Sequence, residues 1–292
     1  MVLRPAPEER SPADLLSFGV VNLDKPPGPS AHQVAGWVRD MTGQERAAHA
    51  GTLDPKVTGC LPVLLGDATR LAQVFADARK EYVTVLELHG PAPADFEAVL
   101  AEFEGPIYQK PPRKSAVKRE LRTREIYDLE VLEREERRAL LRIECEAGTY
   151  VRKLCHDLGL ALGTGANMGD LRRAATGTFD DTTLVTMHDL ADALAFWRED
   201  DNAQQLREVV QPAERALEHL PRLTIADSAA REVAEGAPVY APGVLEGEDV
   251  DEPDGQQVAC YTAAGTAVCI GQLVGDPDAE AGTVVDLDRM LL

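Results

Sequence analysis

The sequence is poor in positive charge, and in lysine above all. Its 292 residues include 50 Asp and Glu but only 30 Lys and Arg, which gives a formal net charge of −20 at pH 7. Such a surplus of acidic groups normally disfavours a polyanionic partner. At about 1 M salt, however, the Debye length falls to roughly 3 Å, and the overall charge is then screened. An acidic, arginine-over-lysine composition with 5% aromatic residues is typical of proteins that work in concentrated salt, where local charge indicates more than net charge.

Cysteine is also scarce, with five residues and no Cys-x-x-C pair. An odd number of cysteines among apolar neighbours favours reduced, buried thiols in a cytoplasmic protein over a disulfide framework. His156 follows Cys155 directly, but adjacent residues on a helix point apart, so we expect no metal site there. The sequence lacks an apolar run long enough to span a bilayer, and its polar first 18 residues do not resemble a signal peptide. These absences disfavour a secreted or membrane protein.

Hydrophobic periodicity divides the chain into an arm and two domains. Residues 1–18 are expected to form a loosely ordered arm. Residues 19–220 mix strand-like and helical patterns, and helical patterns continue to about Leu220. A helix capped by Ser30 is predicted to bury an apolar face with four members: Val34, Trp37, Val38 and Met41. Beyond Pro221, short strand-like runs alternate with Gly and Pro turns, which predicts a small β-rich domain over residues 221–292.

The stretch richest in chemistry runs from His49 to Gly59 and reads His-Ala-Gly-Thr-Leu-Asp-Pro-Lys-Val-Thr-Gly. Pro55 disfavours the helical conformation for Asp54, and Gly51 and Gly59 permit tight turns. A stiff loop of this kind presents one carboxylate in a fixed position, which suits a nucleophile. Asp-Pro turns without chemistry are nevertheless common, and the composition of the loop alone favours that interpretation.

Five ordered motifs, of which this loop is the second, resemble those of the TruB family of pseudouridine synthases. Residues 49–55 are similar to the signature of that family. The other four motifs follow the family's order: Gly19–Gly28, Lys80–Tyr82, Gly148–Leu154, and Leu171–Arg173 with Thr176–Gly177. Any one motif is weak, but a chance match to all five over residues 19–180 is negligible.

Three further segments make the resemblance more specific. Residues 109–127 and 145–157 resemble the archaeal, dyskerin-like branch of the family more than the bacterial branch. Residues 221–245 are similar to the start of a PUA domain, a small β-barrel-like module that binds RNA. The chain departs from the family pattern at three positions that bear on RNA contacts: Ala31 in place of serine, Asn167 in place of histidine, and Thr178 in place of proline.

The resemblance implies both a fold and a reaction. The implied fold is α+β: a pseudouridine synthase domain over residues 19–220, with a central mixed or antiparallel sheet and a catalytic cleft, and a PUA-like barrel over residues 221–292. The implied reaction converts uridine to pseudouridine in RNA without a metal or a cofactor. The base leaves ribose at N1, rotates and reattaches through C5, after the enzyme has flipped it out of the folded RNA.

The resemblance also assigns roles to side chains. Asp54 is the expected nucleophile, and attack on the ribose or on the uracil ring remains open. Arg152 is expected to pair with Asp54 and keep it ionised, and Tyr82 to stack on the flipped base or to take the proton from C5. His49 is expected to insert where the base leaves or to hydrogen-bond the loop, with equal weight. Lys25 is expected to support the loop or to bind a phosphate.

Further RNA contacts are expected from the one basic stretch of the chain, residues 110–124. A solvated loop is the alternative, but a positive cluster in so acidic a chain favours phosphate contacts. The expected side chains are Lys110, Arg113, Lys114 and Lys118 of this stretch, with Arg172 of the last motif. The implied partners are tRNA, at uridine 55 of the TΨC loop, or rRNA sites chosen by an H/ACA guide RNA, together with small H/ACA partner proteins.

Two other classes of function compete with the isomerase. The first is a non-catalytic RNA-binding scaffold of an H/ACA-type particle, which the intact set of Asp54, Tyr82 and Arg152 disfavours. The second is a hydrolase that cleaves sugars with a carboxylate. Such an enzyme needs a second positioned acid, and no motif supplies one.

Overall fold

Two β-sheets organise the chain, and the computed structural model describes residues 3–111, 118–248 and 255–292. The first sheet has nine strands in the order β5-β6-β7-β4-β8-β3-β1-β9, with β2 beside β3. Every pair in it is antiparallel except β3 and β8. Its strands are β1 (Gly19–Lys25), β2 (Ala47–His49), β3 (Thr58–Leu65), β4 (Lys80–Leu88), β5 (Gly105–Gln109), β6 (Arg122–Arg134), β7 (Arg138–Cys145), β8 (Ala166–Thr176) and β9 (Gln211–Pro212).

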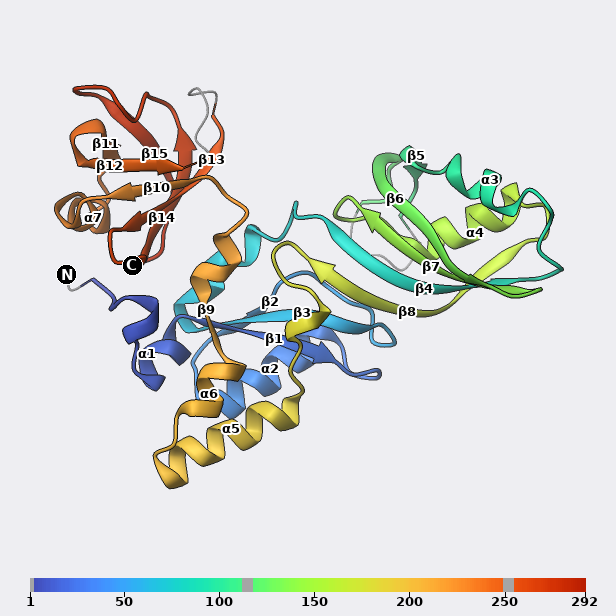
Figure 1. Cartoon of the computed structure of the whole chain (residues 1–292), viewed down its shortest axis with the longest axis horizontal. Coiled ribbons are helices and arrows are strands. Elements are labelled where there is room, and N and C mark those ends of the chain that lie inside the picture. The colour runs from blue at the N-terminus through green and yellow to red at the C-terminus, as the bar shows by residue number, and fades with distance from the viewer. Residues whose placement is uncertain (1–2, 112–117, 249–254) are drawn as a thin grey trace.

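A narrow parallel contact joins the two halves of this sheet. Only Thr58 with Arg172 and Gly59 with Arg173 pair between β3 and β8. Gly59 has a φ of 96°, and a Cβ on it would lie 2.3 Å from the carbonyl oxygen of Arg173. Glycine is therefore required at this crossing. The crossing places the start of β3, and with it the loop from residue 49 to residue 59, beside the end of β8 (Figure 1).

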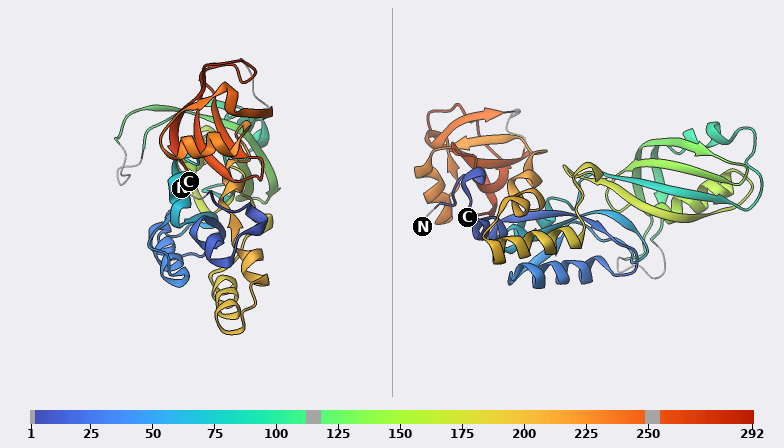
Figure 2. Two further views of the ribbon diagram at one scale, coloured as in Figure 1. Left: turned by 90° about the vertical axis from the view of Figure 1, so that its left-hand side faces the viewer. Right: turned by 60° about the horizontal axis from the view of Figure 1, so that its bottom comes forward.

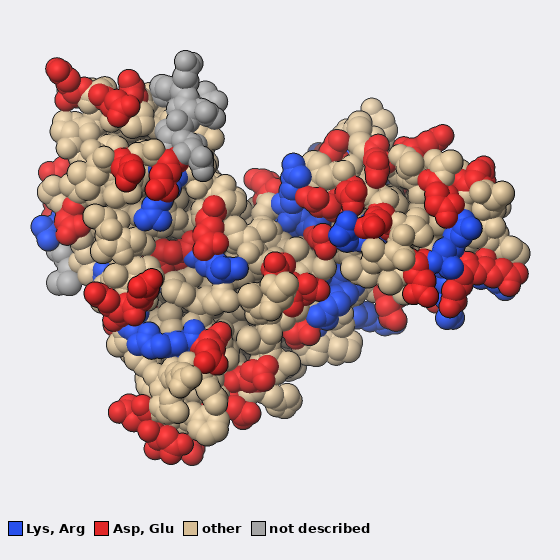
Figure 3. Space-filling model, in the orientation of Figure 1, with Lys and Arg blue, Asp and Glu red and all other residues tan. Residues whose placement is uncertain are grey.

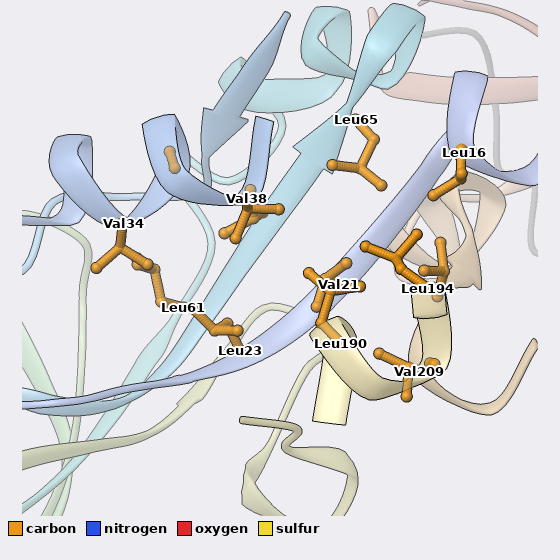
Figure 4. Close-up of a cluster of buried hydrophobic side chains, with 14 of the residues drawn as sticks. Leu16, Val21, Leu23, Val34, Val38, Leu61, Leu65, Leu190, Leu194 and Val209 are labelled. Carbon is orange, nitrogen blue, oxygen red and sulfur yellow. The ribbon is translucent and has the colours of Figure 1, made fainter. Parts of the chain in front are cut away.

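Helices cover each half of the sheet. They are α1 (Pro12–Ser17), α2 (Ala31–Thr42), α3 (Phe96–Ala101), α4 (Val151–Ala161), α5 (Met187–Asp200) and α6 (Gln204–Val209), whereas α7 (Asp227–Ala234) packs on the second sheet. Figure 1 shows α2, α5 and α6 beside β1 and β3, and α3 and α4 beside β4 to β7. The first cluster is shown in Figure 4, where α2, β1 and α5 contribute pairs of apolar side chains: Val34 and Val38, Val21 and Leu23, and Leu190 and Leu194. In the second half, Leu154 and Leu158 of α4 pack with Leu141 and Ile143 of β7.

The second sheet has six strands in the order β11-β15-β14-β13-β10-β12. Its strands are β10 (Arg222–Ile225), β11 (Val239–Tyr240), β12 (Val244–Glu248), β13 (Gln257–Thr262), β14 (Ala267–Leu273) and β15 (Thr283–Met290). This sheet lies at one end of the molecule, and Figure 1 and the right-hand view of Figure 2 show that the β4–β7 lobe extends away from it. The two sheets are not independent, since Val20 and Leu64 of the first share a buried cluster with Ala259 and Ile270 of the second.

The expected α+β class with a mixed sheet and a small β-rich second unit is confirmed. The expectation of a loosely ordered arm is wrong, however. Residues 12–17 form α1 behind a capping box of Ser11 and Asp14, and Leu15 and Phe18 are buried. The polar composition of the segment does not predict these contacts. They form because its few apolar side chains pack on distant elements: β1, the helix over residues 66–73 and α6.

Two local expectations are also wrong. The helical pattern expected to run on to about residue 220 is interrupted by β8, since residues 166–176 pair with β3 and β4. Ala, Leu and Arg are good helix formers, so tertiary pairing overrides propensity here. Trp37, expected on the apolar face of α2, is 45% exposed.

The surface carries the acidic surplus of the sequence. Figure 3 shows Asp and Glu spread over both units on one face, with Lys and Arg as smaller groups among them. The five cysteines are all buried and free, as expected. Within residues 3–111, 118–248 and 255–292, no helix is long and apolar enough to cross a membrane. The same ranges contain no group of three or more His, Cys, Asp and Glu that could hold a metal ion.

Candidate active site

An ion pair between Asp54 and Arg152 lies where the two halves of the first sheet meet. Nη2 of Arg152 is 2.6 Å from Oδ2 of Asp54. Asp54 belongs to the loop between β2 and β3, and Arg152 is the second residue of α4. The two side chains are 56% and 59% exposed, so the pair faces solvent. The pairing expected from the sequence is therefore present, in an open position that a bound molecule could cover.

Gln109 fixes the start of the helix that carries Arg152. Its side-chain amide donates to the carbonyl of Tyr150 at 3.2 Å and accepts from the amide of Tyr150 at 2.9 Å. Tyr150 is the residue before α4, and Gln109 at the end of β5 is 2% exposed. A buried side chain that satisfies both backbone groups of one residue holds that residue rigidly. Gln109 is the first residue of the dyskerin-like segment 109–127, but its sequence context predicts no role for it.

Lys25 supports the Asp54 loop from beneath. Its ammonium is fully buried and donates to the carbonyl oxygens of Pro26, Pro55 and Val57 at 2.9, 3.0 and 2.8 Å. Burial lowers the pKa of Lys25, and the Asp54 carboxylate acts in the opposite direction. All three ammonium hydrogens have acceptors in the protein. These contacts support the loop-support alternative, and binding of an RNA phosphate by Lys25 stays a prediction.

Tyr82 lies on β4, directly opposite Arg173 in the ladder that β4 forms with β8. The ring is half-buried and packs against the apolar clusters of both halves of the sheet. Burial raises the pKa of the Tyr82 phenol, Arg173 opposes that rise by charge and by a hydrogen bond, and Asp54 adds to it. The phenol is therefore neutral near pH 7, and it lies within electrostatic reach of the Asp54 carboxylate.

Two buried cations behind the loop were not assigned by sequence reasoning. Arg173 is 1% exposed and donates to the carbonyl oxygen of Cys60 at 2.7 Å and to those of Ala50 and Gly51 at 3.3 and 3.4 Å. Lys80 is 6% exposed, and burial, followed by the charge of Arg173, lowers its pKa to about 8. Side chains alternate between the two faces of a strand, so a strand at this position predicts that one of the consecutive residues Arg172 and Arg173 points inward. The helical pattern predicted for this segment conceals that signal.

His49 lies on β2, at the start of the loop, opposite Val63 of β3. Burial lowers the pKa of His49, and the charges of His32 and Arg173 lower it further. The imidazole is therefore neutral at neutral pH. Its two expected roles, in the space left by the base or in holding the loop, both stay predictions.

The expected RNA contacts are only partly brought together. Arg172 makes a two-point ion pair with Asp24 at 2.9 and 3.1 Å, which occupies the side of its guanidinium that would grip a phosphate. Lys110 and Lys118 are exposed, and Lys118 forms an ion pair with Glu120. Arg113 and Lys114 lie outside the described residues. RNA binding by this set therefore stays a prediction.

The arrangement suits one kind of chemistry. A single carboxylate is held at the tip of a braced loop, a guanidinium pairs with it and orients it, and a half-buried aromatic ring lies nearby. A second acid for hydrolysis is not part of the arrangement just described. A hollow of about 670 Å³ lies elsewhere, between the two sheets, where Gln73, His219 and Arg289 line it.

Comparison with protein families gives matches over most of the chain. A model of the N-terminal domain of TruB family pseudouridylate synthases matches residues 39–93 and 89–151. A model of the C-terminal domain of tRNA pseudouridylate synthase B matches residues 152–218, and one named the DKCLD (NUC011) domain matches residues 5–35.

Individual proteins are similar over the full length. A probable tRNA pseudouridine synthase B of Haloarcula marismortui is 69% identical over 100% of this chain and 94% of that protein. A probable tRNA pseudouridine synthase B of Halobacterium salinarum is 66% identical over 100% of both chains. A chain in the crystal structure of a Cbf5–Nop10–Gar1 complex superposes with a TM-score of 0.93 at 45% identity, over 99% of this chain and 90% of that one. A chain in the structure of an H/ACA RNP bound to a substrate RNA that contains 2′-deoxyuridine gives 0.92 at 43% identity, over the same shares.

Proposed function

Since the chain belongs to the TruB family of pseudouridine synthases, enzymes that isomerise uridine to pseudouridine in RNA, we propose that Asp54 is the nucleophile of that reaction. The observation that carries the proposal is the ion pair at 2.6 Å between Asp54 and Arg152. It orients one carboxylate at the tip of a loop that Lys25 braces through Pro55 and Val57. A positioned carboxylate is what nucleophilic attack on ribose or on uracil requires.

Tyr82 completes the proposed catalytic set. A flipped uracil needs a flat surface to stack on, and stacking on an aromatic side chain contributes about 1–3 kcal/mol per base. The phenol is neutral near pH 7, because burial raises its pKa. A neutral phenol suits stacking better than acceptance of the C5 proton. Tyr82 is therefore assigned mainly to binding and orienting the base.

The RNA partners follow from the relatives. We propose that this chain modifies tRNA, as the names of its relatives suggest, and that its target there is uridine 55 of the TΨC loop. We also propose that it joins an H/ACA particle with small partner proteins and a guide RNA. The similar solved chains come from a Cbf5–Nop10–Gar1 complex and from an H/ACA RNP with substrate RNA, which supports this assembly. Lys110 and Lys118, with the remainder of the basic stretch 110–124, are the proposed phosphate contacts. Such a protein works in the cytoplasm, where its five free thiols stay reduced.

Domain bounds and working conditions belong to the same proposal. Residues 19–220 are the proposed catalytic domain, and residues 221–292 the proposed PUA-like domain, since β10, the first strand of the second sheet, starts at Arg222. Arg10 and Glu214 form a buried ion pair at 2.6 Å that ties residues 1–18 to the connection between these domains. Concentrated salt is the proposed medium, supported by the net charge of −20 and by the relatives from Haloarcula and Halobacterium.

Tritium release from transcripts labelled at C5 of uridine tests the proposal, because the C5 hydrogen leaves when the base reattaches. The purified protein in 2–3 M KCl should release tritium slowly from a tRNA TΨC stem-loop and faster with partner proteins present. Sites in rRNA should react only when a guide RNA is added. Unguided release from rRNA would contradict the particle assignment, and no release from tRNA under any condition would contradict stand-alone action on tRNA. No release from any RNA, guided or not, would contradict the catalytic proposal itself.

A further inference from the structure

Arg173 carries a buried charge without an acidic partner. Its guanidinium is 1% exposed, and none of the ion pairs between the residues that the structure describes includes it. Burial of an ionised group is costly unless its hydrogen-bonding capacity is met. Arg10, the other arginine that is fully buried, meets that need with the carboxylate of Glu214. Arg173 meets it with backbone carbonyls.

The partners of Arg173 come from separate parts of the site. The guanidinium donates to Cys60 on β3 at 2.7 Å, and to Ala50 and Gly51 of the Asp54 loop at 3.3 and 3.4 Å. It also lies directly opposite Tyr82 of β4 in the β4–β8 ladder, and its charge opposes the rise in the pKa of that phenol. One planar side chain thus binds the loop that carries Asp54 and lies across the ladder from the ring proposed to stack on the base. The rigid fork of a guanidinium makes such multiple contacts possible.

Gly51 shows how closely the guanidinium approaches the loop. Its φ is 89°, which favours glycine, and a Cβ there would lie 3.2 Å from Nη1 of Arg173. Lys25 holds the other half of the same loop through Pro55 and Val57. Asp54 therefore lies between two segments of the loop that buried side chains hold in place. Lys25 holds the segment after Asp54, and Arg173, the residue opposite Tyr82, holds the segment before it.

We propose that Arg173 is a positioning residue, which fixes the Asp54 loop at residues 50 and 51 relative to Tyr82. This inference rests on the proposed role of Asp54 and adds a residue to it. Arg173 does not touch the substrate. It acts through the carbonyls of Ala50 and Gly51, from its position opposite Tyr82 in the β4–β8 ladder, so its loss should lower the rate of the chemical step more than the affinity for RNA.

Single-turnover kinetics with RNA in the presence of excess protein test this directly, because they separate the rate constant from the dissociation constant. For Arg173→Met we expect a rate constant about 100-fold below wild type, the size of effect that a displacement of about 1 Å produces. The RNA dissociation constant should stay within roughly threefold. For Arg173→Lys we expect a loss of about tenfold, because an ammonium cannot reach all the acceptors of a planar fork. Arg10→Met is the matched control: it also removes a fully buried guanidinium, and its folded fraction should keep the wild-type rate constant.

A purely structural role would give a different result. Arg173→Met would then be less stable, but its folded fraction would react at the wild-type rate, and that outcome would overturn the proposal. If Arg173→Met does not fold even in 3 M KCl, Arg173→Lys decides, and a wild-type rate constant in that variant would overturn it equally.

Hydrogen exchange separates this proposal from the assignment of Asp54. The amides of residues 50–53 should exchange faster in Arg173→Lys than in wild type, and Arg10→Lys should leave them unchanged. This readout needs no RNA and no turnover. Inactive wild-type protein would contradict the proposed function alone, whereas unchanged exchange in Arg173→Lys would contradict the positioning role alone.

Discussion

The guanidinium of Arg152 lies 2.6 Å from the carboxylate of Asp54, although 98 residues separate them in the sequence. Both side chains are more than half exposed. An exposed ion pair contributes only about 0–1 kcal/mol to folding. If RNA covers the pair and excludes water, as the proposed function requires, the attraction between the two charges grows. We therefore expect loss of the pair to affect turnover far more than stability.

Asp54→Asn should abolish isomerisation and leave RNA affinity within a few-fold of wild type. The amide keeps the shape of the carboxylate but cannot attack carbon. Tritium release should fall below about one thousandth of the wild-type rate, the scale typical for loss of a nucleophile. Filter binding in the same buffer measures affinity. Turnover above that level would mean that another group makes the covalent bond.

Arg152→Lys should reduce turnover strongly, by about 100-fold or more, because an ammonium cannot orient a carboxylate as a planar fork does. Arg46→Lys provides the control. Arg46 pairs with Asp67 at 2.8 Å and is 57% exposed, much like Arg152, but it lies outside the site. Its variant should turn over at the wild-type rate. If both variants kept normal rates, the pairing of Arg152 with Asp54 would have no part in catalysis.

The fold should require salt. At low ionic strength the 50 acidic groups repel one another across a long Debye length, which destabilises the compact state. Thermal melts from 0.1 to 3 M KCl should therefore show a rising midpoint. A gain of about 3 kcal/mol corresponds to roughly 6–12 °C for domains of 150–250 residues. A midpoint that stays flat or falls would contradict the salt-adapted interpretation of the composition.

Lys80 should make stability depend on pH in the alkaline range. Burial lowers its pKa from 10.5 to about 8 in the folded protein. Between these values the unfolded chain holds a proton that the folded protein has released, so the free energy of unfolding rises with pH, by at most about 1.4 kcal/mol per pH unit. Urea melts of wild type and Lys80→Met from pH 7.5 to 10 should show this slope in their difference. A difference that does not change with pH would mean that the pKa of Lys80 is the same in the folded and the unfolded protein.

The sequence indicated much of the site, because each motif carries its residues in a short contiguous run. Such runs predict Asp54, Lys25 and Arg152 as site residues, and the structure brings them together around one loop. The sequence does not single out Arg173 and Lys80. What distinguishes them is burial without an acidic partner, and burial depends on the register of β8 against β4, which local propensity does not encode.

The fold was predictable to a similar degree. The α+β class and the division into a larger and a smaller unit follow from the hydrophobic periodicity and from the resemblance to the TruB family. The order in residues 12–17 did not, because α1 gains its stability from Leu15 and Leu16 packed on distant elements, and six residues are too few for a stable isolated helix.

The buried pair of Arg10 and Glu214 has a consequence for biosynthesis. Glu214 also accepts a hydrogen bond from the amide of Ala267, and Arg4 donates to the carbonyl of Leu291. Arg10 and its partner Glu214 are 204 positions apart in the sequence. Domains normally fold in order of synthesis, but the contacts of this segment form only after residue 214 has been made. During translation the nascent chain thus exposes Phe18 and leaves Arg10 without its carboxylate, and chaperones would have to protect that surface until residues 213–217 emerge.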